Sequence, residues 1–152
     1  MKVYLGAGSD RKEGFLHLDI VPLDGIDFVC DATKGLPFEN NSVDEIYSQD
    51  FLEHIEPKDV IPLLNEMYRV LKTGGIMEHI TPYAGSKNDF GSPSHVSHWN
   101  EWTWEHFEKG QRRYEVDSKF NGFTGVFERV LLELQHIQEG VPQNIHVIYK
   151  KI

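Results

Sequence analysis

The chain begins with VYLGAGS at residues 3–9, an apolar run that ends in a Gly-x-Gly turn. Glycine tolerates positive φ and has no Cβ, so a strand that ends in this way can turn sharply and approach a ligand closely. The next apolar run ends in a single acid, Asp19. A carboxylate only accepts hydrogen bonds, and at the tip of a neighbouring strand it suits a ribose diol. The two features together predict a site for a cofactor that contains a nucleoside.

The spacing between these two features indicates which cofactor it is. A dinucleotide fingerprint needs a small residue where this chain has Arg11, and its acid follows about 20 residues on. Here Asp19 follows Gly8 by 19 − 8 = 11 residues. That interval is too short for a crossover helix, which typically has about 11–12 residues without its loops. We therefore expect no regular helix between Gly8 and Phe15, and so no helix N-terminus to bind a diphosphate. A nucleoside cofactor without phosphates points to S-adenosylmethionine (SAM).

The composition predicts one globular domain over residues 1–152, with 39% apolar, 12% aromatic and 26% charged residues. No apolar run approaches the roughly 18 residues of a membrane span, so we expect no signal peptide, no membrane association and a cytoplasmic location. Cys30 is the only cysteine, which excludes an internal disulfide and a Cys-based zinc site. The net charge of −9 opposes nucleic-acid binding, which draws on Lys and Arg.

Hydrophobic periodicity predicts an α/β fold with a mostly parallel sheet. A helix is expected over residues 58–72, stopped by Gly74 and Gly75, and a second over residues 101–109, capped by Asn100. The last two strands are joined by a short connection and should be antiparallel. Strands are expected over residues 3–5, 15–20, 27–30, 43–48, 76–81, 126–137 and 145–150.

Seven short motifs follow one another in order: LGAGS at 5–9, HLDI at 17–20, DA at 31–32, LPF at 36–38, SVDEI at 42–46, FLEHI at 51–55 and EMYRVLKTGG at 66–75. In this order they resemble the class I SAM-dependent methyltransferases, in particular the compact type-11-like group. The resemblance implies a Rossmann-like class I fold with a C-terminal antiparallel hairpin and reduced N-terminal helices. It also implies SAM as the cofactor, and transfer of its methyl group to oxygen or nitrogen of a small or polar acceptor.

The resemblance further implies roles for individual residues. Gly6 and Gly8 would line the methionine and ribose, Asp19 would hold the ribose hydroxyls, and Asp31 would accept from the adenine amine. Two positions depart from the family pattern, since Tyr4 and Asp10 stand where an acid and a third glycine are frequent. The expected cofactor-binding set is Leu5, Gly6, Ala7, Gly8, Asp10, Asp19, Ile20, Asp31, Ala32, Ser48, Gln49 and Asp50.

Three histidines are the candidates for a catalytic base. The enzyme must hold acceptor and methyl in line, about 3–3.5 Å apart, and often remove a proton, for which histidine suits neutral pH. His54 follows the fourth expected strand, while His95 and His98 lie in the insert after the fifth. The alternative is that His54 packs against a helix and the other two bond within their loop. His79, His95 and His98 could also be considered as metal ligands, but the segment is expected to be a loop without enough ligands, so we expect no metal.

The acceptor is expected to be a small molecule whose identity the sequence leaves open. Many members of the resembled family enclose it with an N-terminal helical cap, whereas the first strand expected here begins at residue 3. The acceptor site would then come from the insert at residues 83–99, a partner protein or a second subunit in a homo-oligomer. Two alternatives remain: a SAM-binding sensor or inactive subunit, favoured by Tyr4 and Asp10, and an NAD-dependent or nucleotide-sugar enzyme, opposed by Arg11.

Overall fold

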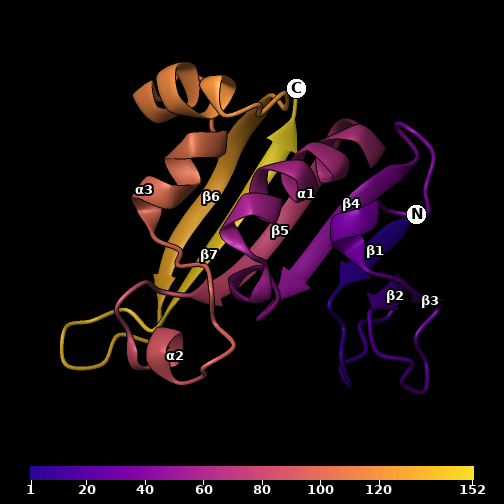
Figure 1. The fold of residues 1–152 in the computed structure, drawn as a ribbon, viewed down its shortest axis with the longest axis horizontal. Coiled ribbons are helices and arrows are strands. Elements are labelled where there is room, and N and C mark those ends of the chain that lie inside the picture. The colour runs from indigo at the N-terminus through magenta and orange to yellow at the C-terminus, as the bar shows by residue number, and fades with distance from the viewer.

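One seven-stranded sheet runs through the protein, whose computed structural model describes residues 1–152. The strand order is β3-β2-β1-β4-β5-β7-β6 (Figure 1). The first five strands are parallel, and β7 is antiparallel to both of its neighbours, which confirms the expected α/β sheet and C-terminal hairpin. The strands are β1 (Lys2–Leu5), β2 (Phe15–Asp19), β3 (Phe28–Val29), β4 (Val43–Gln49), β5 (Leu71–Pro82), β6 (Phe127–Gln135) and β7 (Asn144–Lys151).

Helices are few, and only α1 is longer than five residues. The α-helices are α1 (Pro57–Val70), α2 (Lys87–Phe90) and α3 (Glu101–Trp104). Single turns complete the set: η1 (Ala32–Lys34), η2 (Leu52–His54), η3 (Glu105–Phe107) and the π-helical η4 (Tyr114–Ser118). Turns and bends without a helix join β1 to β2, which confirms the expectation from the short spacing. None of the helices combines the length and apolar character needed to cross a bilayer.

The two faces of the sheet are covered differently. Figure 1 shows α1 and α3 on the same face, where 23 buried hydrophobic residues form the main core. The opposite face carries a cluster of four, Tyr4, Ala7, Phe15 and Tyr47. The asymmetry arises because the connections between the first four strands contain no helix longer than one turn. Most of the packing that holds the sheet is therefore on the side of α1.

The single long helix, α1, buries one side against the sheet. Leu63, Leu64, Met67 and Val70 are fully or almost fully buried, and their spacing of three and four residues places them on one side. The expected stop at Gly74 and Gly75 is wrong, because the helix already ends at Val70. Leu71 is extended and pairs with Val43 of β4, and the residues up to the next pair, Glu45 with Ile76, form a bulge.

Three other expected elements differ from the structure. The strand over residues 27–30 is only two residues long, at the edge of the sheet. The helix over residues 101–109 is one α-helical turn followed by the 3₁₀ turn η3, although its cap at Asn100 is confirmed by a capping box with Thr103. The insert at residues 83–99 contains α2, whose four residues are too few for helical periodicity to be visible in the sequence.

An aromatic layer under α3 encloses a neutral histidine. Trp104 is fully buried and stacks on Tyr149 and on His79, with ring centroids 5.8 and 5.6 Å apart. The Nδ1 atom of His79 lies 2.7 Å from Oγ of Ser48 on the neighbouring strand. Burial lowers the pKa of His79 to about 3, because the apolar surroundings disfavour the charged ring. His79 thus has a structural role in the core.

We expect the buried His79 to weaken the fold in acid. The unfolded chain binds a proton at this ring near pH 6.5, whereas the folded protein does so only near pH 3. Between these values the free energy of unfolding falls by up to about 1.4 kcal/mol per pH unit from this group. His79→Asn lacks this pH-dependent loss. The difference in free energy of unfolding between wild type and His79→Asn should therefore shrink as pH falls from 7 to 5.

Urea unfolding at pH 7, 6 and 5 measures this difference. At pH 7 the variant should be less stable by about 1–3 kcal/mol, because the stack on Trp104 is lost. His136→Asn, at an exposed position near the end of β6, is the control and should keep the wild-type pH dependence. Parallel stability curves for wild type and His79→Asn would contradict the prediction.

Candidate functional site

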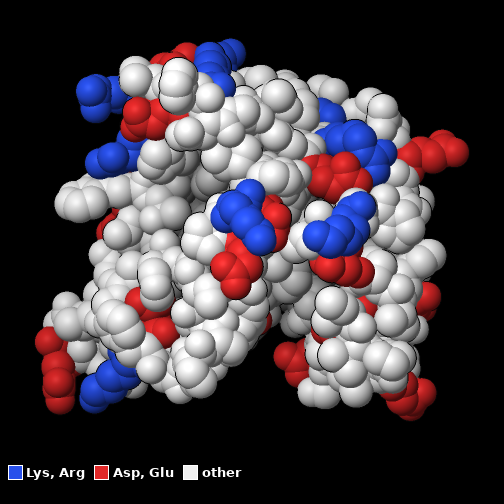
Figure 2. All heavy atoms as spheres, viewed as in Figure 1, with Lys and Arg blue, Asp and Glu red and all other residues white.

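A cavity of about 480 Å³ lies at the carboxyl ends of the parallel strands. Leu5 and Gly6 line it from the end of β1, Asp19 from β2, and Asp31 and Asp50 from the segments after β3 and β4. Figure 2 shows this face of the molecule hollowed below α1, with acidic side chains beside the hollow. Its volume is within the range of small-molecule sites, and open α/β sheets bind ligands at this edge.

Gly6 forms one wall of the cavity in a backbone conformation that other residues rarely adopt. Its φ is +64°, and a Cβ at this position would lie 2.8 Å from Cγ of Phe51. Both strain and steric overlap therefore exclude a side chain here. Gly8 also has positive φ, at +52°, but open space around it. The two glycines turn the chain at the end of β1 and leave the backbone of the turn accessible to a ligand.

The carboxylate of Asp19 joins the ends of β1 and β2. Its Oδ2 accepts from the amide of Gly8 at 2.8 Å, and its Oδ1 accepts from the amide of Val21 at 2.9 Å. Each oxygen retains a further lone pair for a ligand, since a carboxylate offers about four acceptor positions. Asp19 thus holds the glycine turn in place and also lines the cavity.

Asp31 is held in a similar way at the end of β3. Its Oδ1 accepts from the amide of Thr33 at 2.9 Å and from Oγ1 of the same residue at 2.6 Å, which caps η1. These hydrogen bonds lower the pKa of Asp31, so the group is ionised at neutral pH. Because both bonds are made by Oδ1, Oδ2 is left to accept from a ligand.

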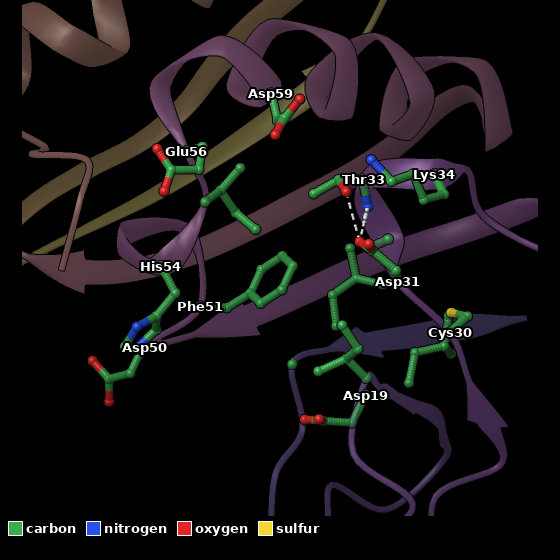
Figure 3. A pocket seen from close by; sticks show the side chains of 16 residues that line it. Asp19, Cys30, Asp31, Thr33, Lys34, Asp50, Phe51, His54, Glu56 and Asp59 are labelled. Carbon is green, nitrogen blue, oxygen red and sulfur yellow. Dashed lines mark hydrogen bonds between the residues drawn. The ribbon is translucent and has the colours of Figure 1, made fainter. Parts of the chain in front are cut away.

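The cavity is strongly acidic. Five carboxylates line it, and Lys34 is the only lysine or arginine among the lining residues. This excess of negative charge favours a ligand with positive groups and opposes one with phosphates. Figure 3 shows Asp19 and Asp31 on one side, Asp50 and His54 on the other, and the Phe51 ring between them. The five acids are Asp19, Asp31, Asp50, Glu56 and Asp59.

Asp50 has a left-handed backbone conformation, with φ of +50°, directly after β4. Its amide donates to the carbonyl of Ile80 on β5 at 3.0 Å, which holds the turn against the sheet. Non-glycine residues with positive φ are uncommon and concentrate at functional sites. The turn sends the chain from β4 into Phe51 and η2, so both the ring of Phe51 and His54 reach the cavity.

The structure brings most of the expected cofactor-binding residues to this cavity. Leu5, Gly6, Asp19, Ile20, Asp31, Ala32 and Asp50 line it. Ala7, Gly8 and Asp10 belong to the turn without lining the cavity. Ser48 and Gln49 do not line it either, because Ser48 is buried beside His79 and the Gln49 amide bonds to the Tyr47 hydroxyl.

The sequence analysis missed several lining residues, among them Phe51, Lys34, Glu56 and Asp59. Phe51 directly follows Asp50, so its position after a strand was a usable signal. Glu56 precedes α1 and Asp59 lies in its first turn, and only the packing of that helix beside η1 brings them to the cavity.

The candidate histidines separate into different environments. His54 lines the cavity, and the ring of His95 lies across from it, with centroids 4.9 Å apart. His98 instead pairs with the buried Asp89, Nδ1 to Oδ1 at 2.8 Å. His79 is in the core, so the set of His79, His95 and His98 considered above is not brought together.

Glu53, His54 and His95 do meet, with one ligand atom of each within 4.8 Å of the others. Glu53 is only 1% exposed. Burial raises the pKa of this carboxyl group to about 8.

Comparison with known proteins agrees with this geometry. The family described as "Methyltransferase domain" matches residues 8–78, while no curated protein matches the chain. A SAM-dependent methyltransferase from Archaeoglobus fulgidus is similar in structure, with a TM-score of 0.66, 16% identity, and coverage of 99% of this chain and 85% of that one. The methyltransferase CalH in complex with SAH gives a TM-score of 0.68 at 15% identity, over 99% of this chain and 51% of that one.

A third solved structure is a Haloferax volcanii complex between the Trm112 methyltransferase activator and a methyltransferase. It gives a TM-score of 0.64 at 14% identity, over 99% of this chain and 81% of the matched chain. These neighbours establish the Rossmann-like fold, and the matched domain covers β2, β3, β4 and the aspartates at their ends. Residues 8–78 thus resemble a methyltransferase domain in sequence, and the whole chain shares the fold of these three solved structures.

Proposed function

We propose that the acidic cavity binds SAM and that the protein transfers the methyl group to oxygen or nitrogen of a small or polar acceptor. The observation that carries the proposal is the charge of the cavity around the Gly6 turn. SAM has a positive sulfonium and a positive ammonium group against a single carboxylate, so its net charge is positive, and it has no phosphate. Five carboxylates with a single lysine fit that charge, and the helix-free connection after β1 offers no diphosphate site.

In the proposed pose, adenosine lies between Asp19 and Asp31. Asp19 accepts from the ribose hydroxyls through its remaining lone pairs, and Oδ2 of Asp31 accepts from the adenine amine. The methionine part follows the backbone at Gly6, where the absence of a Cβ allows close approach. Asp50, across the cavity, faces the positive charge of the sulfonium or ammonium. Ile20 and Ala32 supply apolar contacts to the adenosine.

The chemical step requires positioning more than activation, since the methyl group is already on a sulfonium. The protein holds the acceptor atom in line with the S–CH₃ bond, which removes most of the entropic cost of bringing the reactants together. Of the three candidate histidines, His54 is the one that lines the cavity. Its imidazole is the group we place beside the acceptor.

Titration calorimetry with S-adenosylhomocysteine (SAH) tests the cofactor part of this proposal. We expect saturable binding to one site, and no heat with NAD, because the acidic cavity repels its diphosphate. Absence of SAH binding at high micromolar concentration would overturn the proposal. SAH binding without methyl transfer to any of a broad set of alcohols, amines and carboxylates would instead favour the sensor or inactive subunit considered above.

Gly6→Ala should abolish or strongly weaken SAH binding, because a Cβ at Gly6 overlaps the Phe51 ring that lines the cavity. Gly14→Ala is the matched control. Gly14 also has positive φ, at +80°, but no atom lies within 4 Å of the added Cβ. Backbone strain destabilises each variant by about 1 kcal/mol. Only Gly6→Ala also displaces the Phe51 ring. We expect at least about tenfold weaker SAH binding for Gly6→Ala relative to Gly14→Ala. Equal affinities would contradict the assigned role of Gly6.

Asp31→Asn should change which base the site prefers. The amide retains an oxygen to cap η1 but replaces the free Oδ2 with an NH₂ group, so it can donate but no longer accept at that position. We expect about tenfold weaker binding of SAH. S-inosylhomocysteine, which carries a carbonyl oxygen in place of the amine, should bind the variant better than it binds wild type.

Competition calorimetry with the two ligands measures this exchange of preference. Asp24→Asn, an exposed aspartate outside the cavity, is the control and should leave both affinities unchanged. An Asp31→Asn protein that keeps the wild-type preference for SAH would show that Asp31 does not contact the base.

We also propose that a partner protein or a second copy completes the acceptor side. The Haloferax volcanii neighbour was solved with an activator protein, which supports a partner of that kind. Phe90 of α2 is 75% exposed, and the carbonyl of the preceding residue, Asp89, contacts His95 beside the cavity.

A further inference from the structure

The turn η2 and the segment after α2 bring three metal-binding side chains together beside the cavity. Glu53, His54 and His95 each place one ligand atom within 4.8 Å of the other two. They come from two parts of the chain about 40 residues apart. His54 also lines the cavity, so the cluster lies at its edge.

The carboxylate of Glu53 has no partner in the fold. The residue is 1% exposed, and neither Oε1 nor Oε2 accepts a hydrogen bond. Lysine and arginine side chains make ion pairs elsewhere in the protein but none with Glu53. Buried carboxylates are otherwise paired or bound to a metal, since desolvation without a partner is costly. The group is therefore free to bind a ligand that the chain itself does not supply.

The two histidines are held so that each presents a free nitrogen. The Nδ1 atom of His54 lies 3.2 Å from the carbonyl oxygen of Ser94, and that of His95 lies 2.9 Å from the carbonyl oxygen of Asp89. A carbonyl only accepts, so each Nδ1 carries the proton and each Nε2 has a lone pair. Metal-binding histidines are oriented in this way, with the second nitrogen donating to a carbonyl or carboxylate.

Hydrogen bonds to backbone carbonyls hold the segment that carries His95 against the turn that carries Glu53 and His54. The amides of Val96 and Ser97 both donate to the carbonyl of Glu53, at 2.8 and 3.1 Å, and Oγ of Ser97 donates to the carbonyl of Leu52 at 2.7 Å. The segment that carries His95 is thus joined to the turn that carries Glu53 and His54. A metal site needs such fixed ligands, because the ion tolerates little error in geometry.

We propose that Glu53, His54 and His95 bind a divalent transition-metal ion at the edge of the cavity. Two imidazoles and one carboxylate are the donors that Zn²⁺ and its neighbours prefer, whereas Mg²⁺ selects sites made of oxygen. Bonds of about 2.0–2.2 Å at a tetrahedral ion place ligand atoms about 3.3–3.6 Å apart. Ligand atoms that lie within 4.8 Å of one another therefore close by up to about 1.5 Å when the ion binds. Three protein ligands leave a coordination position open on the side of His54, which faces the cavity.

This inference deepens the proposed function, on which it rests, by selecting an oxygen acceptor. A hydroxyl group bound at the open position has a lowered pKa and releases its proton to water. The oxygen then forms a bond to the methyl carbon while the S–CH₃ bond breaks, and the electron pair of that bond stays on sulfur to give neutral SAH. With the ion bound, His54 serves as a ligand, and the ion takes over the activation of the acceptor.

Titration of the metal-free protein with Zn²⁺, and with Co²⁺ followed by its visible absorption, tests the site. We expect one ion per chain, and at least about tenfold weaker binding in Glu53→Gln, His54→Ala and His95→Ala. His136→Asn removes an exposed histidine away from the cluster and should bind like wild type. Binding of Zn²⁺ by Glu53→Gln as tightly as by wild type, or of Mg²⁺ in preference to Zn²⁺, would overturn the proposal.

SAH binding by the same proteins separates this proposal from the proposed function. A wild-type far-UV circular dichroism spectrum for each metal-site variant would show that lost metal binding is not unfolding. Wild type that binds SAH but no metal would refute the metal site and leave the proposed function intact. Wild type that binds metal but not SAH would refute the proposed function and retain the site.

Discussion

The hydrogen bond from the Gly8 amide to the Asp19 carboxylate is the contact on which the cavity depends. It joins the ends of β1 and β2 directly, across a connection that contains no helix. The short connection leaves the strand ends open, and the positive φ of Gly6 turns the backbone at the wall of the cavity. A helix at this position would have placed its positive N-terminus in the cavity and favoured phosphate. Here the charge comes from carboxylates instead.

The scarcity of helices between the first four strands has a consequence for stability. The sheet is held mainly from one side, where α1 and the aromatic residues around Trp104 cover the central strands. The other face has only the small cluster around Tyr4 and Tyr47, partly covered by Lys12 over the Tyr47 ring. Buried polar groups such as His79 and Ser48 therefore lie in the main core, where a charge is least tolerated.

The acidic cavity and the cluster of Glu53, His54 and His95 adjoin each other just after the end of β4. Asp50 turns the chain with positive φ and faces the acidic cavity, and three residues later the η2 turn buries Glu53 beside His54 and His95. The proposed cofactor and the proposed metal ion thus depend on the same short segment, with the acceptor between them. A single turn can serve both, because Asp50 and Phe51 line the cavity, Glu53 is buried, and His54 belongs to both the cavity and the cluster.

The sequence alone determined the order of the strands along the chain, the glycine turn, and the aspartates at the ends of β2 and β3. These follow from local rules: apolar periodicity, the conformational freedom of glycine, and a spacing too short for a helix. Only the tertiary structure decided that α1 ends at Val70, since pairing of Leu71 with Val43 overrides the glycine stop. Only the tertiary structure shows that Glu53 and His95 lie close together. Contacts between residues about 40 apart arise from packing, and no periodic pattern in the sequence predicts them.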